Sequence, residues 1–235
     1  TQGRARCDHP LQHPIMRILH KFDGESEREK ITSLTGHARE IIRNGQTVTC
    51  IFPDTQEVMV ERSRAESISS KLPEPIEAIS DHYQFSTAGD ERIAGRDTWV
   101  VSISPRDAYR YGYQLWIDKE NHLLLKSELR DESGEPLEMV MFTQLEIHDA
   151  LPDELFSPSI TGREFTWYQY TQENGAVAAA AATEVSGPSQ WQVTWMPEGF
   201  SLSDYDERNV TDTPLEHMIY SDGVSSVSIF IERIT

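Results

Sequence analysis

Apolar and polar residues alternate along two long stretches of the chain, which is the pattern of half-buried β-strands. In the first stretch, from Ile15 to Met59, turn-forming pairs separate the alternating segments: Asp23-Gly24, Thr35-Gly36, Asn44-Gly45 and Pro53-Asp54. Asn-Gly and Asp-Gly favour the positive φ angles that tight hairpins require. This stretch therefore predicts an antiparallel meander.

The strand that ends at Phe52 is predicted to bury one side only. Val48, Cys50 and Phe52 lie on one side, while Thr47 and Thr49 lie on the other. Because alternate residues of a strand share a face, we expect Val58 and Val60 to continue this apolar side after the next turn.

A short helix is predicted from Glu74 to His82. Pro73 and Pro75 stand at its start, where proline is tolerated, and Ile76 and Ile79 are spaced three apart. We expect this helix to cap the sheet.

The second alternating stretch predicts four further strands between Trp99 and Phe142. Their apolar positions are Trp99, Val101 and Ile103, then Tyr111, Tyr113, Leu115 and Ile117, then Leu123, Leu125 and Leu129, and finally Leu137, Met139 and Met141. Val140 and Phe142 make the last strand apolar on its other side as well. Such a strand is expected to be covered on both sides.

The pattern is lost after Pro158, where residues 159–190 are rich in Gly, Ala, Ser and Gln. This composition indicates a linker. Residues 191–235 begin a second unit that is too short to bury a core of its own, so we expect it to be incomplete. The predicted organisation is a domain at 1–160, a linker at 161–190 and the start of a second domain at 191–235.

Charge and hydropathy narrow the classes of partner. The formal net charge is −18 and the sequence pI is about 4.8, so the chain would repel a phosphate backbone, and nucleic acid is not predicted as a partner. The longest uniform apolar run, Ala176 to Ala182, is far shorter than the roughly 20 residues that cross a bilayer, so no membrane span is predicted. Residues 1–14 lack the order of a secretion signal.

The sequence carries no motif of a common enzyme class, so no catalytic residue is assigned and an enzyme is not predicted. Pro10 lies between His9 and His13 and disfavours the helix that would let both bind a metal, so no metal or cofactor is predicted either. The acidic pairs Asp118 with Glu120 and Asp131 with Glu132 stand at hairpin tips, where Asp sets turn geometry.

Two cysteines, Cys7 and Cys50, could form one disulfide, but the apolar strand pattern around Cys50 favours a buried thiol.

The apolar side of the second stretch is the best candidate for function. A curved antiparallel sheet that does not close leaves a concave surface able to hold an acyl chain, and each buried methylene contributes about 0.8 kcal/mol. The candidate lipid-groove residues are Trp99, Leu123, Leu125, Met139 and Met141. The same residues would also suit an ordinary core, and periodicity alone does not separate the two interpretations.

Two blocks of sequence resemble a known family. The segment from Leu115 to Asp131, LWIDKENHLLLKSELRD, is followed by Gly134 to Glu138, GEPLE. Together they are similar to a hairpin pair shared by the RseB/MucB family and, more loosely, by the lipoprotein carriers LolA and LolB. The second block, WMPEGF at Trp195 to Phe200 with YSDG at Tyr220 to Gly223, resembles the opening of the second RseB domain, which a simple carrier lacks.

The resemblance, which extends from about Met16 to the end of the chain, implies a fold and a site. The fold class is mainly β (α+β): a curved antiparallel half-open β-barrel with short helices, like LolA, linked to a small and apparently truncated β-rich domain. The partner-binding candidates are Trp195, Phe200, Tyr220 and Asp222, which are family-motif positions that could also serve folding alone.

The function implied is negative regulation of a sigma-E-type envelope stress response. The protein would be periplasmic, bind the periplasmic region of a membrane anti-sigma factor, protect it from proteolysis and release it on sensing lipid or lipopolysaccharide. The alternative is a periplasmic carrier of lipoprotein acyl chains or lipid. The oligomeric state is left open, a homodimer included.

Overall fold

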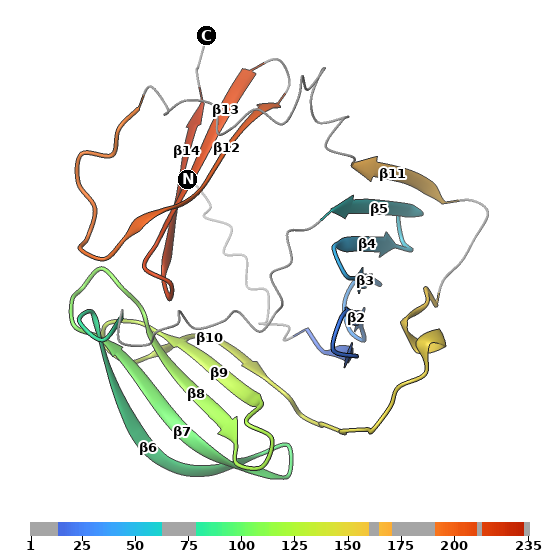
Figure 1. Cartoon of the computed structure of the whole chain (residues 1–235), viewed down its shortest axis with the longest axis horizontal. Helices are drawn as coiled ribbons and strands as arrows, with labels where there is room; N and C mark the ends of the chain where they lie inside the picture. Colours follow the sequence, from blue (N-terminus) through green and yellow to red (C-terminus); the bar gives the residue numbers. More distant parts are fainter. Residues whose placement is uncertain (1–13, 63–78, 160–164, 171–190, 211–212, 233–235) are drawn as a thin grey trace, which may run out of the picture. The chain divides into compact units, whose positions relative to one another are not determined.

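Three β-sheets make up the described part of the chain (Figure 1). The computed structural model describes residues 14–62, 79–159, 165–170, 191–210 and 213–232. The contacts divide the chain into two compact units, one with residues 1–69 and 148–182 and the other with residues 70–147 and 183–235. Sheet A lies in the first unit, and sheets B and C lie in the second.

Sheet A is a six-stranded sheet with the order β1-β2-β3-β4-β5-β11. Its strands are β1 (Met16–Phe22), β2 (Glu27–Ser33), β3 (Glu40–Asn44), β4 (Thr47–Phe52), β5 (Glu57–Arg62) and β11 (Thr166–Tyr170). The first five pair in chain order and antiparallel, which confirms the predicted meander. β11 falls within the segment 161–190 predicted as a linker and pairs parallel to β5.

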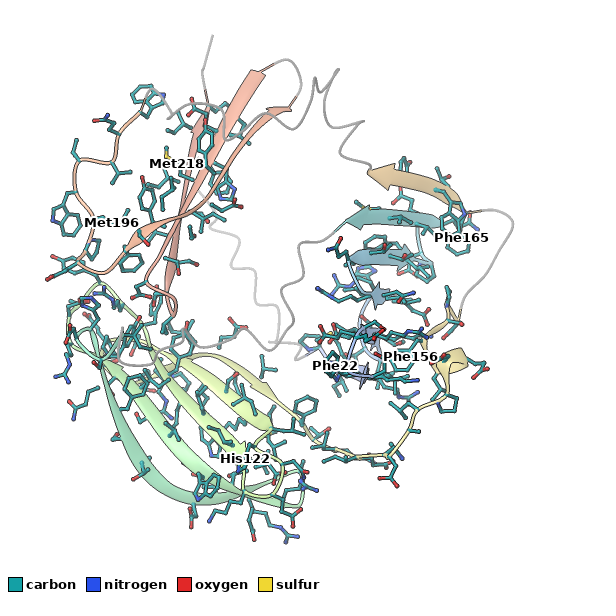
Figure 2. The ribbon with its side chains drawn as sticks, viewed as in Figure 1. Phe22, His122, Phe156, Phe165, Met196 and Met218 are labelled. Atoms are coloured by element: carbon teal, nitrogen blue, oxygen red, sulfur yellow. The ribbon has the colours of Figure 1, made fainter. Side chains whose placement is uncertain are left out.

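The core of sheet A corrects the predicted facing of β4 and β5. Ile51 lies opposite Val58 and both are buried with Ile42, while Cys50 lies opposite Met59. Val58 and Val60 therefore share the side of Ile51 rather than that of Cys50. The turn fixes the register at Phe52 opposite Glu57, so counting every second residue across the turn assigns the wrong face. Phe165 packs against this core (Figure 2).

The segment around the 3₁₀ helix η2 (Asp153–Phe156) is tied to sheet A by charged groups. Lys30 Nζ donates to the Ser157 carbonyl at 2.7 Å and to Ser159 Oγ at 2.6 Å, and it lies 3.6 Å from the buried Glu40 carboxylate. Phe156 is buried beside these contacts. A buried Lys–Glu pair is tolerated here because hydrogen bonds satisfy both groups.

Sheet B is a five-stranded antiparallel meander with the order β10-β9-β8-β7-β6, and it curves strongly along its strands (Figure 1). Its strands are β6 (Tyr83–Ile93), β7 (Arg96–Pro105), β8 (Gly112–Asp118), β9 (Leu124–Arg130) and β10 (Pro136–Met141). The four strands predicted between Trp99 and Phe142 correspond to β7 to β10 and are confirmed. The expectation that the last of them is covered on both sides is wrong, because β10 is an edge strand and all six of its residues are exposed.

One side of sheet B, which we call the closed face, carries a fully buried cluster. Val100, Trp116 and Leu125 form it with Ile93, and Phe142 packs against them. The predicted apolar positions of β7 and β8 lie on the opposite side, so the residues expected to face solvent form this core. Leu125 joins it because a register shift after Trp116 leaves Leu125 as an extra, bulged residue.

Sheet C consists of β12 (Ser201–Val210), β13 (Thr213–Ser221) and β14 (Ser226–Glu232), paired antiparallel in that order. Met218, near the middle of β13, is buried (Figure 2). In each of the three sheets the first and the last strand of the order do not pair with each other, so none of the sheets closes into a barrel. The predicted mainly β fold with open sheets and a small C-terminal β unit is confirmed.

Several predictions fall partly or wholly outside the described residues. Of the predicted helix at Glu74 to His82, only residues 79–82 are described; they form a turn in which the His82 N–H donates to the Ile79 carbonyl at 3.1 Å. Cys7, the other half of the possible disulfide, also lies outside them. No helix in the described ranges is long and apolar enough to span a bilayer.

The packing of Leu125 predicts a large loss of stability on truncation. Leu125→Ala should lower the free energy of unfolding by about 2–5 kcal/mol, because Leu125 is 1% exposed within the closed-face core. Leu123→Ala, which truncates a side chain that is 43% exposed two residues earlier, is the matched control and should cost less than about 1 kcal/mol. Urea unfolding followed by circular dichroism measures both, and equal losses would contradict the assignment of Leu125 to the core.

Candidate functional site

The side of sheet B opposite the closed face is apolar but incompletely covered, and we call it the open face. Residues directly opposite on neighbouring strands share a face. Trp99 lies opposite Ile117, which lies opposite Leu124, and Val101 lies opposite Leu115. Ser127 separates Leu115 from Val140 in the latter row. Trp99, Leu124 and Val140 are exposed, and Val101, Leu115 and Ile117 are half-buried.

A hydrogen-bonded hairpin turn contacts Trp99 at one end of the open face. The indole stacks on the imidazole of His122, with ring centroids 5.8 Å apart, and Figure 2 shows His122 in the turn between β8 and β9. His122 adopts a φ of 56°, in the left-handed region. The carboxylate of Asp118 holds the turn by accepting from Arg96 Nε at 2.9 Å and from Asn121 N at 3.3 Å.

The two aspartates predicted to set turns do so. Burial would raise the pKa of Asp118, but the hydrogen bonds from Arg96 and Asn121 outweigh it and hold the pKa below its ordinary value. Asp131 Oδ1 accepts from the Ser133 hydroxyl at 2.7 Å and from the N–H groups of Glu135 and Ser133, both at 2.9 Å, and these hydrogen bonds hold its pKa below the ordinary value. Both carboxylates are therefore ionised turn caps, which confirms the predicted role.

The other end of the open face is covered by sheet C. Ile103 and Tyr113 lie opposite each other there and form a cluster with Ile79 and Tyr83. Val224, in the turn between β13 and β14, packs against this cluster. Along β8, Tyr113, Leu115 and Ile117 point to the same side, so the area under Val224 is continuous with the exposed area around Trp99.

A buried arginine fixes the turn of sheet C onto sheet B. Arg110, between β7 and β8, is 0% exposed at its side chain, and its Nε donates to Asp222 Oδ2 at 2.6 Å. Its terminal nitrogens donate to the Asp107 carboxylate and to the carbonyl of Glu198. Its guanidinium lies 4.8 Å from the centre of the Phe200 ring. We call this group the Arg110 joint.

The Asp222 carboxylate, 1% exposed, serves both sheets at once. Oδ1 accepts from the N–H groups of Val224 and Ser225, at 2.9 and 2.7 Å, and so forms the turn of sheet C. Oδ2 accepts from Arg110 and from the hydroxyl of Tyr83 at 3.0 Å. The same side chain therefore shapes the turn and attaches it.

The electrostatics of the Arg110 joint favour the charged pair. Burial would raise the pKa of Asp222, but the hydrogen bonds from Arg110, from the turn and from Tyr83 hold it below its ordinary value. Burial would likewise lower the pKa of Arg110, and its bond to Asp222 and the charge of Asp107 raise it instead. The hydroxyl of Tyr83 has a raised pKa, chiefly because it is buried.

The five lipid-groove candidates lie on different parts of sheet B. Trp99 lies on the open face, Leu123 in the hairpin turn beside it and Leu125 in the closed-face core. Met139 and Met141 lie opposite Glu128 and Lys126, on the side of Trp116, so they share the closed side rather than that of Trp99. The five do not form one surface, and their role in lipid binding stays a prediction.

The four partner-binding candidates lie in or near the Arg110 joint. Asp222 and Phe200 contact Arg110 directly. Trp195 is exposed and meets Tyr109 edge to face, with ring centroids 5.2 Å apart. Tyr220 is half-buried on β13, two residues before Asp222. These contacts give Asp222 and Phe200 a structural role, and the partner-binding role of all four stays a prediction.

Sequence reasoning missed Arg110, Tyr83 and Val224. An arginine three residues after Asp107 in a loop reads as a surface pair, and only the fold brings it to Asp222, 112 residues later. The available signal was the Asp222-Gly223 turn itself, because an Asp at that position caps the turn and leaves its second oxygen for another donor. The open-face residues Val101, Leu115 and Ile117, by contrast, are among the apolar positions that the alternating pattern identifies.

Other arrangements of the described residues offer little chemistry. No three His, Cys, Asp or Glu side chains within these ranges lie close enough to hold a metal ion. A hollow of about 370 Å³ opens at the end of sheet B near the loop that carries Arg110, with Arg106, Tyr113 and Arg130 in its lining. None of the five lipid-groove candidates lines it.

Family models match most of the chain. The MucB/RseB N-terminal domain matches residues 9–160, and the MucB/RseB C-terminal domain matches residues 185–235. The sigma-E factor regulatory protein RseB of Haemophilus influenzae is 27% identical over 229 residues, which cover 96% of this chain and 68% of RseB. The sigma factor AlgU regulatory protein MucB of Pseudomonas aeruginosa is 28% identical over 228 residues, which cover 92% of this chain and 64% of MucB.

Solved structures give the same relationship. MucB in complex with MucA(peri) superposes with a TM-score of 0.66 at 26% identity, covering 94% of this chain and 69% of that one. A second complex, of Pseudomonas aeruginosa MucA and MucB, also superposes with a TM-score of 0.66 at 26% identity. The match covers 92% of this chain and 69% of that one. MucB alone superposes with a TM-score of 0.57 at 25% identity, covering 92% of this chain and 68% of that one. The chain thus spans about two thirds of the length of these relatives.

The Arg110 joint predicts that removing the arginine alone is more harmful than removing the charge pair. Arg110→Met should lower the free energy of unfolding by about 3–5 kcal/mol, because it leaves the Asp222 charge buried and unpaired. Adding Asp222→Asn should recover part of that loss.

The matched control is Lys119→Met, which breaks an ion pair to Asp90 whose side chains are 30% and 65% exposed. It should cost less than about 1 kcal/mol. Urea unfolding compares all three variants. An Arg110→Met protein as stable as Lys119→Met would show that the joint does not hold sheet C.

Proposed function

The chain belongs to the MucB/RseB family, and from this membership we propose that it is a negative regulator of an envelope stress response. It binds the periplasmic region of a membrane anti-sigma factor and protects that region from proteolysis. The observation that carries this proposal is that both family domains match, with MucB relatives at about a quarter identity solved as complexes with MucA. A protein with this partner works in the periplasm.

The relatives are named as regulatory proteins, which supports the prediction that this chain is not an enzyme. The C-terminal match at residues 185–235 also argues against the alternative of a simple lipid or lipoprotein carrier, since the second domain is what distinguishes the regulators from the carriers. The predicted domain limits at 160 and 191 agree in outline with this division and stay predictions.

Release of the partner by lipid is the finer part of the proposal, and the open face is the surface that supports it. Trp99, Ile117 and Leu124 form an apolar row that ends at solvent. The same face runs under Val224, so an aliphatic chain bound along it would approach the turn of sheet C. A lipid releases a partner only if it binds the partner-free state more tightly, and that coupling acts equally in both directions.

Binding to an anti-sigma segment is the direct test of the regulator. The chain should bind the purified periplasmic segment of Pseudomonas aeruginosa MucA in isothermal titration calorimetry, with a dissociation constant in the micromolar range or below, and should slow cleavage of that segment by added protease. A segment of the same composition in scrambled order is the control. No heat of binding and no protection would refute the proposed function.

Lipid binding to the chain alone tests the open face. Trp99→Ser should weaken binding of purified lipopolysaccharide by about tenfold, because an indole contributes of the order of 1.5–3 kcal/mol when buried against an apolar ligand. Met141→Ser is the control, since Met141 is 43% exposed against 41% for Trp99 and lies on the other side of sheet B. Thermophoretic titration measures both. Equal weakening by the two variants would place the lipid elsewhere.

A further inference from the structure

β10 (Pro136–Met141) is the outermost strand of sheet B and pairs on one side only, with β9. No strand of the described ranges pairs with its outer edge. Alternate N–H and C=O groups of an edge strand point away from the sheet and need hydrogen-bond partners, which water or another strand supplies. The outer edge of β10 is therefore open to a further strand.

The side chains of β10 are unusual for an edge in contact with water. All six residues are exposed, and four of them are large and apolar: Leu137, Met139, Val140 and Met141, at 43–58% exposure. Proteins usually protect an edge with charge, proline or a bulge. Pro136 and the register shift before Glu138 protect the first part of β10, while Met139 to Met141 have no such protection.

The other edge of the same sheet is a natural comparison. The exposed residues of β6 (Tyr83–Ile93) along its outer part include Ser86, Thr87, Asp90 and Glu91. That edge also carries a register shift between Thr87 and Gly89. It is polar and irregular, as expected of an edge that stays in water, whereas β10 is apolar and regular after Glu138.

The apolar residues of β10 project to both sides of the sheet. Met139 and Met141 face the closed side, and Val140 faces the open side. A strand added at this edge would meet apolar neighbours on both faces, so apolar residues in consecutive positions of the incoming strand would be buried.

Charge around the edge restricts the incoming strand further. Glu132, Glu135 and Glu138 are exposed near the start of β10, and none of them forms an ion pair with a described residue. The nearby cations, Lys126 and Arg130, are both paired with Glu128. The start of β10 therefore favours a basic residue in the segment that pairs with it.

We propose that β10 accepts an extended segment of the partner polypeptide as an additional strand of sheet B. Backbone hydrogen bonds to Glu138 through Met141 hold the segment, its apolar residues pack on Met139, Val140 and Met141, and a basic residue lies near Glu132 and Glu135. This proposal rests on the proposed function, because it takes the periplasmic segment of the anti-sigma factor as the incoming strand.

The test combines backbone protection with a matched pair of variants. Amide hydrogen exchange of the whole chain, with and without the periplasmic segment of Pseudomonas aeruginosa MucA, should show slowed exchange at Glu138 to Met141 and none along β6. Val140→Lys should weaken binding of the segment by about tenfold. Thr87→Lys adds the same charge at the opposite end of the same cross-strand row and should leave binding unchanged.

Each outcome decides the proposal. Binding with unchanged exchange at β10, or equal affinities for the Val140→Lys and Thr87→Lys proteins, overturns the assignment of this edge and leaves the proposed function standing. Failure of the unmodified chain to bind the segment refutes the proposed function and this proposal with it. If the amides of β10 are protected without the segment, and sedimentation shows that the chain self-associates as its concentration rises, a second copy occupies the edge. That result also overturns the proposal.

Discussion

The buried pair of Arg110 and Asp222 is the interaction on which the second unit depends. Neither side chain reaches solvent, and between them they connect the loop after β7, the segment before β12, the turn of sheet C and the start of β6. Taking two charges out of water is costly unless geometry and extra hydrogen bonds compensate. Both oxygens of the Asp222 carboxylate and each nitrogen of the Arg110 side chain have a hydrogen-bond partner. These bonds offset the desolvation of the two charges, and they form together only in this arrangement of sheets B and C.

The Arg110 joint also determines where the open face ends. Sheet B buries its closed face around Trp116, and it buries its open face only near the turn that Asp222 shapes. Val224 packs against the cluster of Ile79, Tyr83 and Ile103 at this end, whereas Trp99 at the other end is exposed. The area of the open face left exposed to a ligand therefore depends on a polar contact as well as on the curvature of the sheet.

How much of this was predictable depends on the range of the interaction. Strands and turns follow from local pattern, so the meander of sheet A and the strands from Trp99 to Met141 were predictable from the sequence. Which side of the sheet a residue faces depends on register, and register is set by turn length and by bulges. Val58 was therefore predicted on the wrong side, and the sequence pattern left open whether Leu125 lies in a core or in a groove. The Arg110 joint connects residues more than a hundred positions apart; the Asp222-Gly223 turn indicates a carboxylate oxygen left for a donor, but a single sequence does not identify Arg110 as that donor.

Among the site residues, the family-motif positions Asp222 and Phe200 both contact Arg110, but a motif does not distinguish a residue that binds a partner from one that holds the fold. Physical context makes the distinction clearer. A carboxylate with all of its hydrogen bonds made inside the chain has little left to offer a partner, whereas Trp195 is 63% exposed beside its contact with Tyr109.

A polar joint suits a regulator better than an apolar one of equal size. Replacing a buried ion pair by well-packed apolar residues is often neutral or stabilising, so charge is not the simplest means of fixing two sheets together. What a buried pair provides is a specific docking geometry, because leaving either charge unpaired is costly, while the intact pair adds little net stability. A ligand of ordinary affinity can shift such an equilibrium, since the free energy it must supply is only the difference between the docked and undocked states. In this chain the apolar open face is continuous with the area that the joint covers, so the element that a ligand would need to shift is the one held by charge.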